Sequence, residues 1–176
     1  MKRTQEMVLC ALFAALTAVG AQLALPVGPV PVNLALLPVL MAGMLLPPRT
    51  AALSAAVYLA MGAVGLPVFS GMRGGAGHLM GPVGGYVAGY VLCAGLTARL
   101  RALGQGSFRR DFAACCAGVA ACHLTGMAWF MIVTRAGVAQ TLQLTLAPFI
   151  LPDLAKAALA AWVAPRMRNA IRARYP

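Results

Sequence analysis

Long apolar runs almost free of charge, separated by short basic stretches, constrain this chain more than any other feature. Only 10% of its 176 residues are charged, and 61% are hydrophobic. A soluble domain needs roughly 25% charged residues to cover its surface with groups that water can solvate. The pattern therefore predicts an all-α integral membrane protein with a single domain over residues 1–176.

Six runs are predicted to be transmembrane helices, because a hydrocarbon core of about 30 Å takes roughly 20 residues at 1.5 Å each. They cover Met7 to Leu25, Asn33 to Leu46, Thr50 to Leu66, Val87 to Leu100, Phe112 to Val133, and Leu144 to about Pro165. A proline-rich loop over residues 26–32 separates the first two. The second run has 14 residues and contains Pro38, so a re-entrant segment is its alternative.

The basic residues favour six spans with both ends in the cytoplasm. Eleven of the 14 Lys and Arg then lie on one side, with Arg73 and Arg135 on the other and Lys156 inside the last span. Cytoplasmic loops carry such an excess, and a re-entrant second run would turn the basic tail outward. No basic stripe is interleaved with aromatic residues, so despite the net charge of +11 we expect no nucleic-acid partner.

Asp153 and Lys156 stand inside the last apolar run, three residues apart and so on one helix face. Ionisable residues are costly inside a membrane, and each is a functional hypothesis. We interpret the pair as part of a pocket that opens to the outside, where the carboxylate accepts hydrogen bonds and the ammonium attracts an anionic group. The alternative is an ion pair that only locks the helix into the bundle.

The loop from Pro67 to Gly85 has seven glycines and several apolar side chains, which predicts a packed external loop over the pocket rather than a solvated linker. Within it, Arg73 is a candidate anion partner at the pocket mouth. Phe69, Tyr86 and Trp129 either pack on a flat ligand or fill the membrane interface.

Catalytic and metal-binding patterns are absent from the sequence. Its carboxylates are Glu6, Asp111 and Asp153, no phosphate-binding loop is present, and His78 has no neighbouring ligand set. We therefore expect no enzyme activity, no cofactor and no metal. The five cysteines are interpreted as small packing residues.

The first helix carries small residues at four-residue spacing, a pattern that favours close helix packing within this chain, in a homo-oligomer or against a partner. These residues are Ala11, Ala14, Ala15 and Ala18.

Several motifs together resemble the BioY family, the biotin-binding S components of energy-coupling factor (ECF) transporters. They are Pro29-Val30-Pro31-Val32, the run from Gly62 to Phe69, Gly74-Gly75, the run from Gly81 to Tyr86, Pro148-Phe149, Pro152-Asp153 and Lys156. The resemblance implies a six-helix protein of the bacterial cytoplasmic membrane with a biotin pocket near its outer face.

The resemblance also implies roles for particular residues. Asp153 would accept the ureido N–H groups of biotin, and either Lys156 or Arg73 would pair with its carboxylate. Asn33, Phe69, Gly75 and Tyr86 would complete the substrate site. The alanines at positions 11, 14, 15 and 18 would dock onto a transmembrane coupling subunit, which carries two ATPase subunits that hydrolyse ATP.

Some positions depart from the family pattern. Asn33 and Ala35 stand where Thr and Gln are common, and Val83 replaces a frequent Thr. Two alternatives therefore stay open: an S component for another small vitamin, and a membrane scaffold without a solute site.

Overall fold

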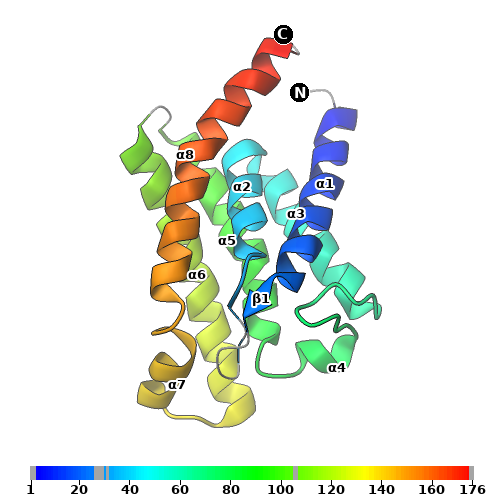
Figure 1. Ribbon diagram of the computed structural model, residues 1–176, viewed down its shortest axis with the longest axis vertical. Helices are drawn as coiled ribbons and strands as arrows, with labels where there is room; N and C mark the ends of the chain where they lie inside the picture. Colours follow the sequence, from blue (N-terminus) through cyan, green and yellow to red (C-terminus); the bar gives the residue numbers. More distant parts are fainter. Residues whose placement is uncertain (1–2, 26–29, 31, 105–106, 175–176) are drawn as a thin grey trace.

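The protein is described by a computed structural model over residues 3–25, 30, 32–104 and 107–174. The elements are α1 (Arg3–Gln22), β1 (Ala24–Leu25), β2 (Val32–Asn33), α2 (Leu36–Leu45), α3 (Pro48–Ala63), α4 (Ala76–Leu79), α5 (Gly84–Ala102), α6 (Phe108–Thr134), α7 (Val138–Thr145) and α8 (Ile150–Arg174) (Figure 1). The fold is helical apart from one short antiparallel pair, in which Ala24 lies opposite Asn33.

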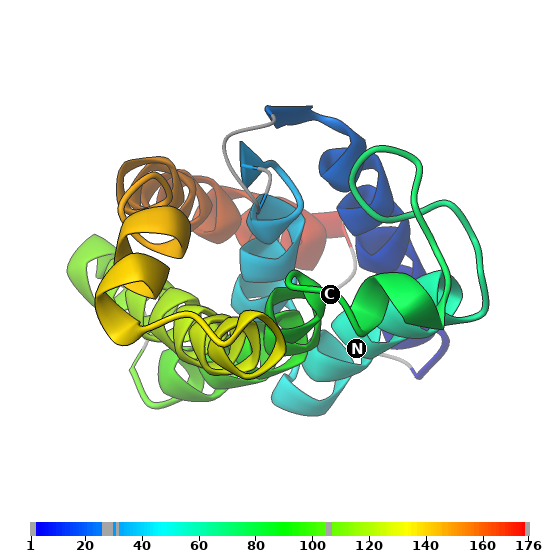
Figure 2. The same cartoon turned by 90° about the horizontal axis from the view of Figure 1, so that it is seen from below.

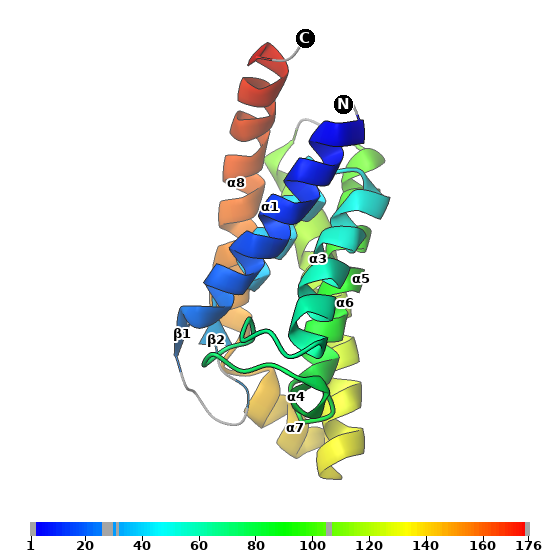
Figure 3. The same ribbon diagram turned by 90° about the vertical axis from the view of Figure 1, so that its right-hand side faces the viewer.

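The longer helices form an elongated bundle with two different ends. The start of α1 and the end of α8 lie at one end, whereas β1, α4 and α7 lie at the other (Figures 1 and 3). Most irregular chain between the helices gathers at this second end, which also holds the candidate site.

α2 is the central element and contacts α1, α3, α5, α6 and α8 (Figure 2). Its ten residues, LLPVLMAGML, are all uncharged, so every side of the helix can be buried against a neighbour. Pro38 does not interrupt α2, because it lies in the first turn, where a backbone N–H has no intrahelical acceptor.

α5 and α6 lie against each other through glycines that leave no room for a side chain. Gly89 of α5 meets Thr125 of α6, and Gly126 of α6 meets the ring of Tyr86 on α5. This close approach fixes the position of Tyr86 and of the neighbouring α6 residues at the candidate site.

Two described helices, Thr4–Gln22 and Phe108–Thr134, are long and apolar enough to cross a membrane. A third crossing is possible for Val138–Thr145 together with Ile150–Arg168, a pair bent by 54°. α2 measures only about 15 Å and is too short to cross a 30 Å core alone. The prediction of six spans therefore goes further than helix length and composition alone support.

The last helix differs from its prediction at both ends. The polar stretch before it forms α7, and α8 begins at Ile150 rather than Leu144. The helix is also longer than the predicted span, because α8 continues through Pro165 to Arg174. A proline removes one backbone donor, and the Arg and Ala residues that follow favour helix. Most of the predicted loop over residues 26–32 lies outside the described residues.

Candidate functional site

A pocket lies at the end of the bundle that carries β1, α4 and α7. Its lining combines apolar and aromatic side chains with a few polar groups, a composition typical of small-molecule sites. The lining residues are Val30, Asn33, Leu36, Tyr58, Phe69, Ser70, His78, Val83, Tyr86, Val87, Tyr90, Cys122, His123, Phe149, Asp153 and Lys156.

The space between these residues, mouth included, is about 630 Å³. Its interior is narrow, with a cavity volume of about 60 Å³.

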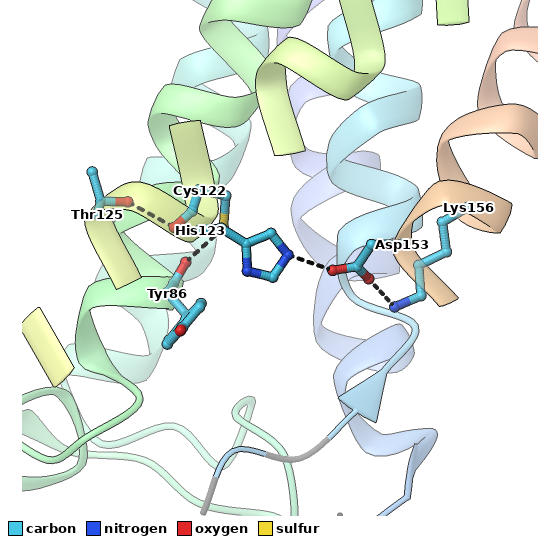
Figure 4. Close-up of polar contacts among 6 residues, drawn as sticks. All are labelled: Tyr86, Cys122, His123, Thr125, Asp153 and Lys156. Atoms are coloured by element: carbon cyan, nitrogen blue, oxygen red, sulfur yellow. Dashed lines mark hydrogen bonds and ion pairs between the residues drawn. The ribbon is translucent and has the colours of Figure 1, made fainter. Parts of the chain in front are cut away.

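Three ionisable side chains form the floor of the pocket (Figure 4). Lys156 Nζ donates to Asp153 Oδ1 at 2.8 Å, and His123 Nε2 lies 2.9 Å from Asp153 Oδ2. The exposed fractions are 3% for Asp153, 7% for Lys156 and 8% for His123. Each oxygen of the buried carboxylate thus has one donor from the protein, and a carboxylate retains further lone pairs for a ligand.

The start of α8 explains the position of the carboxylate. Asp153 is the fourth residue of α8, where the positive end of the helix dipole favours a negative charge. Pro152 precedes it in the first turn, which needs no backbone donor. Lys156 follows one turn later on the same face, so a single helix start supplies both members of the ion pair.

His123 was not identified from the sequence. It lies in α6, and its ring is flanked by Tyr86 at 6.0 Å and Phe149 at 6.2 Å between ring centroids, both edge to face. The signal that identified Asp153, an ionisable residue inside an apolar run, was equally present at His123.

Aromatic rings form the wall of the pocket. Phe69 is 1% exposed and stacks on His78 at a centroid distance of 5.2 Å. Tyr58 meets Phe69 edge to face at 5.6 Å and lies 6.3 Å from Tyr90. A partly polar, flat-sided cavity of this kind suits a compact ring system.

Residues 64–83, from the end of α3 to the start of α5, form a glycine-rich segment that supplies Phe69, Ser70, His78 and Val83 to the pocket lining. Gln22 at the end of α1 holds it: the side-chain amide donates to Val68 O at 3.2 Å and to Phe69 O at 3.1 Å. The Gln22 oxygen accepts the Met72 N–H at 3.0 Å.

Two further side chains hold the same segment. Asn33 Nδ2 donates to Ser70 Oγ at 2.7 Å, and the Tyr58 hydroxyl donates to Val68 O at 3.3 Å. The segment is thus attached to α1, β2 and α3 mainly by side chains that bond to its backbone.

Five of the seven predicted substrate-site residues lie together in the pocket lining: Asn33, Phe69, Tyr86, Asp153 and Lys156. Arg73 and Gly75 do not line it. Arg73 is exposed, and its backbone pairs with that of Phe69. Gly75 has φ +92°, a conformation that disfavours other residues, and its N–H donates to Gly62 O at 2.7 Å.

Trp129 joins α6 to the glycine-rich segment, because its indole N–H donates to Gly81 O at 3.0 Å. Among the residues that the structure describes, no group of three His, Cys, Asp or Glu side chains is placed to hold a metal ion.

The four alanines of α1 face two directions. Ala14 is buried and Ala18 packs partly against the core, whereas Ala11 and Ala15 are exposed beside Leu12 and Leu16. The small-residue face is therefore divided between the interior of this chain and its outer surface.

Comparison with known proteins gives one consistent result. The sequence matches the model of the BioY family over residues 1–173. It is 37% identical over 167 residues to the probable biotin transporter BioY of Pyrococcus horikoshii, which covers 95% of this chain and 98% of that protein. The biotin transporter BioY of Thermotoga maritima is 32% identical over 165 residues, with 94% and 96% covered.

A solved structure has the same fold. The S-component for biotin from an ECF-type ABC transporter superposes with a TM-score of 0.87 at 27% sequence identity, over 96% of this chain and 95% of that chain.

Proposed function

This chain belongs to the BioY family, and we propose that it is a membrane S component that captures biotin for uptake by an ECF-type transporter. The observation that carries the proposal is the buried Asp153–Lys156 pair at the floor of an aromatic-walled pocket. Biotin has a fused apolar ring system, a ureido group with N–H donors and a carbonyl, and an aliphatic tail that ends in a carboxylate. The pocket offers a partner for each of these parts.

The ureido ring binds at the floor, where Asp153 accepts N–H groups and Lys156 donates to the carbonyl. The aromatic rings of Tyr58, Phe69 and Tyr86 enclose the bicycle, and Asn33 contributes a polar contact. The tail then extends to the mouth, where the exposed Arg73 pairs with the carboxylate. Lys156 lies beside Asp153 at 2.8 Å, at the floor where the ureido ring binds, which supports Arg73 as the partner of the tail.

In the membrane, the chain has six spans with both ends in the cytoplasm, and the glycine-rich segment caps the pocket from the outside. Two features support this topology: α1 begins and α8 ends at the same end of the bundle, and the sequence has eleven of its 14 Lys and Arg in the segments that six spans assign to one side. α2 is short, but other helices surround it, and protein contacts permit short or irregular segments at membrane depth.

ATP hydrolysis would be the task of partner subunits, because no phosphate-binding loop is present in this sequence. A transmembrane coupling subunit binds the outer face of α1 around Ala11 and Ala15, where small residues permit close helix packing. Two ATPase subunits on that partner hydrolyse ATP. This chain therefore acts as a transport subunit and not as an enzyme.

A thermal-shift panel on the purified chain tests the proposal, since a ligand that binds only the native state raises the melting temperature. Biotin is expected to raise it, whereas riboflavin, thiamine and folate are not. Asp153→Asn is expected to remove the biotin response. Asp111→Asn changes a different buried carboxylate, which lies in α6, and should retain the response to biotin.

A response to another vitamin but not to biotin would identify an S component of different specificity. The absence of any response, with the chain folded, would favour a scaffold without a solute site.

A further inference from the structure

The floor of the pocket contains a buried hydrogen-bonding atom that pairs with no residue described by the structure. His123 Nδ1 is buried and has no hydrogen-bond partner among the described residues, although the ring lines the pocket. Its other nitrogen, Nε2, is engaged by Asp153 at 2.9 Å. An unmade hydrogen bond at a buried polar atom is costly, and each case in a native structure needs an explanation.

The contacts of the ring indicate which nitrogen carries the proton. An ionised carboxylate only accepts hydrogen bonds, so Nε2, which faces Asp153 Oδ2, is the protonated nitrogen. In the neutral imidazole, Nδ1 is then an acceptor. The site balances one negative charge on Asp153 with one positive charge on Lys156, so a neutral His123 leaves the floor without net charge.

The ring has little freedom to place Nδ1 elsewhere. Tyr86 and Phe149 pack edge to face against it, and the bond from Nε2 to Asp153 fixes the remaining direction. In Figure 4 the ring lies between α6 and α8 with Nε2 toward Asp153 and its other nitrogen on the side of Tyr86. His123 is 8% exposed, so water from outside does not readily satisfy this atom.

We propose that His123 determines ligand specificity directly: its Nδ1 accepts one N–H of the cyclic urea, while Asp153 accepts the other. This inference rests on the proposed function and extends it by assigning an α6 side chain to the ligand. A floor with two acceptors of different kinds selects a ring that presents two separate N–H donors.

The test combines ligand and protein changes in a cycle. The ligands are biotin and its two carbamate analogues, in each of which one ureido N–H is replaced by an oxygen atom of similar size. For the wild-type chain, isothermal titration should give at least about tenfold weaker binding for each analogue, because each leaves one buried acceptor unpaired.

In His123→Phe, one of the two analogues should bind as well as biotin, within about twofold, because its missing N–H no longer has a partner to lose. The matched control is Leu124→Phe, which places the same ring at the next position of α6, on its exposed side. It should keep the wild-type discrimination against both analogues.

Two smaller substitutions separate the functions of the two nitrogens. His123→Asn places an amide oxygen near the position of Nδ1. It should retain the discrimination against the carbamate analogue that lacks the N–H facing residue 123. His123→Gln extends its amide toward Asp153 and should retain stability but lose that discrimination. If His123→Phe does not fold, this pair still decides the question.

The outcomes separate this inference from the proposed function. If the wild-type chain does not bind biotin, the proposed function fails. If it binds biotin, but both analogues lose as much affinity in His123→Phe and His123→Gln as in the wild type, His123 does not contact the ureido group and the inference alone fails.

Discussion

The floor of the pocket and the glycine-rich segment that lies over it are built in different ways. The floor consists of side chains on α6 and α8, two long helices. Asp153 bonds there to Lys156 at 2.8 Å and to His123 at 2.9 Å. The glycine-rich segment has one short helix and is held by Gln22, Asn33 and Tyr58 through neutral hydrogen bonds.

This difference separates recognition from access. Regular helices fix the polar groups before the ligand arrives, so little ordering remains to oppose binding. Segments with few regular contacts open at a smaller free-energy cost than the core of a fold. Changes to the floor should therefore alter whether a ligand binds, and changes to the segment should mainly alter how fast it leaves.

The largest effect is expected from Lys156→Met, which leaves Asp153 buried without its cation. Breaking a buried ion pair costs about 3–5 kcal/mol, so the melting temperature should fall and biotin binding should be lost. The double variant Asp153→Asn with Lys156→Met should recover most of the stability but bind biotin at least about 100-fold more weakly. Thermal unfolding and titration measure the two quantities separately. Biotin binding at wild-type strength by the double variant would show that the floor charges do not recognise the ligand.

The next effect concerns the junction between the two regions. A methyl group on Gly62 of α3 would overlap the ring of Phe69, whereas one on Gly77 would meet nothing within 4 Å. Overpacking of this kind costs about 1–3 kcal/mol, or roughly 5- to 150-fold in affinity when it displaces a pocket wall. Gly62→Ala should weaken biotin binding within that range, and Gly77→Ala should not. Equal affinities in titrations of both variants would mean that Phe69 does not shape the bound state.

The floor and the glycine-rich segment also show which parts of the site can be predicted from the sequence. Asp153 and Lys156 were predicted because ionisable residues stand out in an apolar run, and their pairing followed from helical spacing. His123 has the same signal in its own run, but nothing in the local sequence indicates that it faces Asp153. Its link to Asp153 spans 30 positions, which no local pattern encodes.

The attachment of the glycine-rich segment could not be predicted from local pattern. Gln22 bonds to a backbone oxygen 46 residues away, and a bond to backbone leaves no trace in the identity of the accepting residue. The motifs predicted a packed loop and a wall residue, Phe69. Which side chains hold that loop is decided by the packing of α1 against α3, which only the fold provides.

A smaller effect is expected from Gln22→Leu, which removes the bonds to Val68, Phe69 and Met72. Each neutral hydrogen bond contributes about 0.5–1.5 kcal/mol to the stability of the structure that it holds. The dissociation rate of biotin should rise about tenfold with little change in the association rate, and the Met72 amide should exchange faster with deuterium. Gln143→Leu, a change at an exposed glutamine of α7, is the matched control. An unchanged dissociation rate in Gln22→Leu would show that the segment does not limit ligand release.

The smallest effect is a dependence of release on pH through His78. Partial burial, and then the charge of Arg73, hold the pKa of His78 below its ordinary value of 6.5. His78 therefore binds a proton more readily when the glycine-rich segment is open than when it is closed. Its contribution to the stability of the closed segment is complete above about pH 6.5 and is lost as the pH falls toward the lowered pKa. Biotin should dissociate about two- to threefold faster at pH 5.5 than at pH 7.5.

His78→Phe keeps a ring against Phe69 and should flatten this pH profile. Arg73→Gln also removes the proposed partner of the biotin carboxylate, so it should raise the dissociation rate at every pH. It should reduce the change with pH, because the charge of Arg73 helps to lower the pKa of His78. His123 is present in both variants, so any pH effect from the floor appears equally in each. An identical profile in wild type and His78→Phe would assign the pH dependence to the floor, and the glycine-rich segment would then not respond to protons.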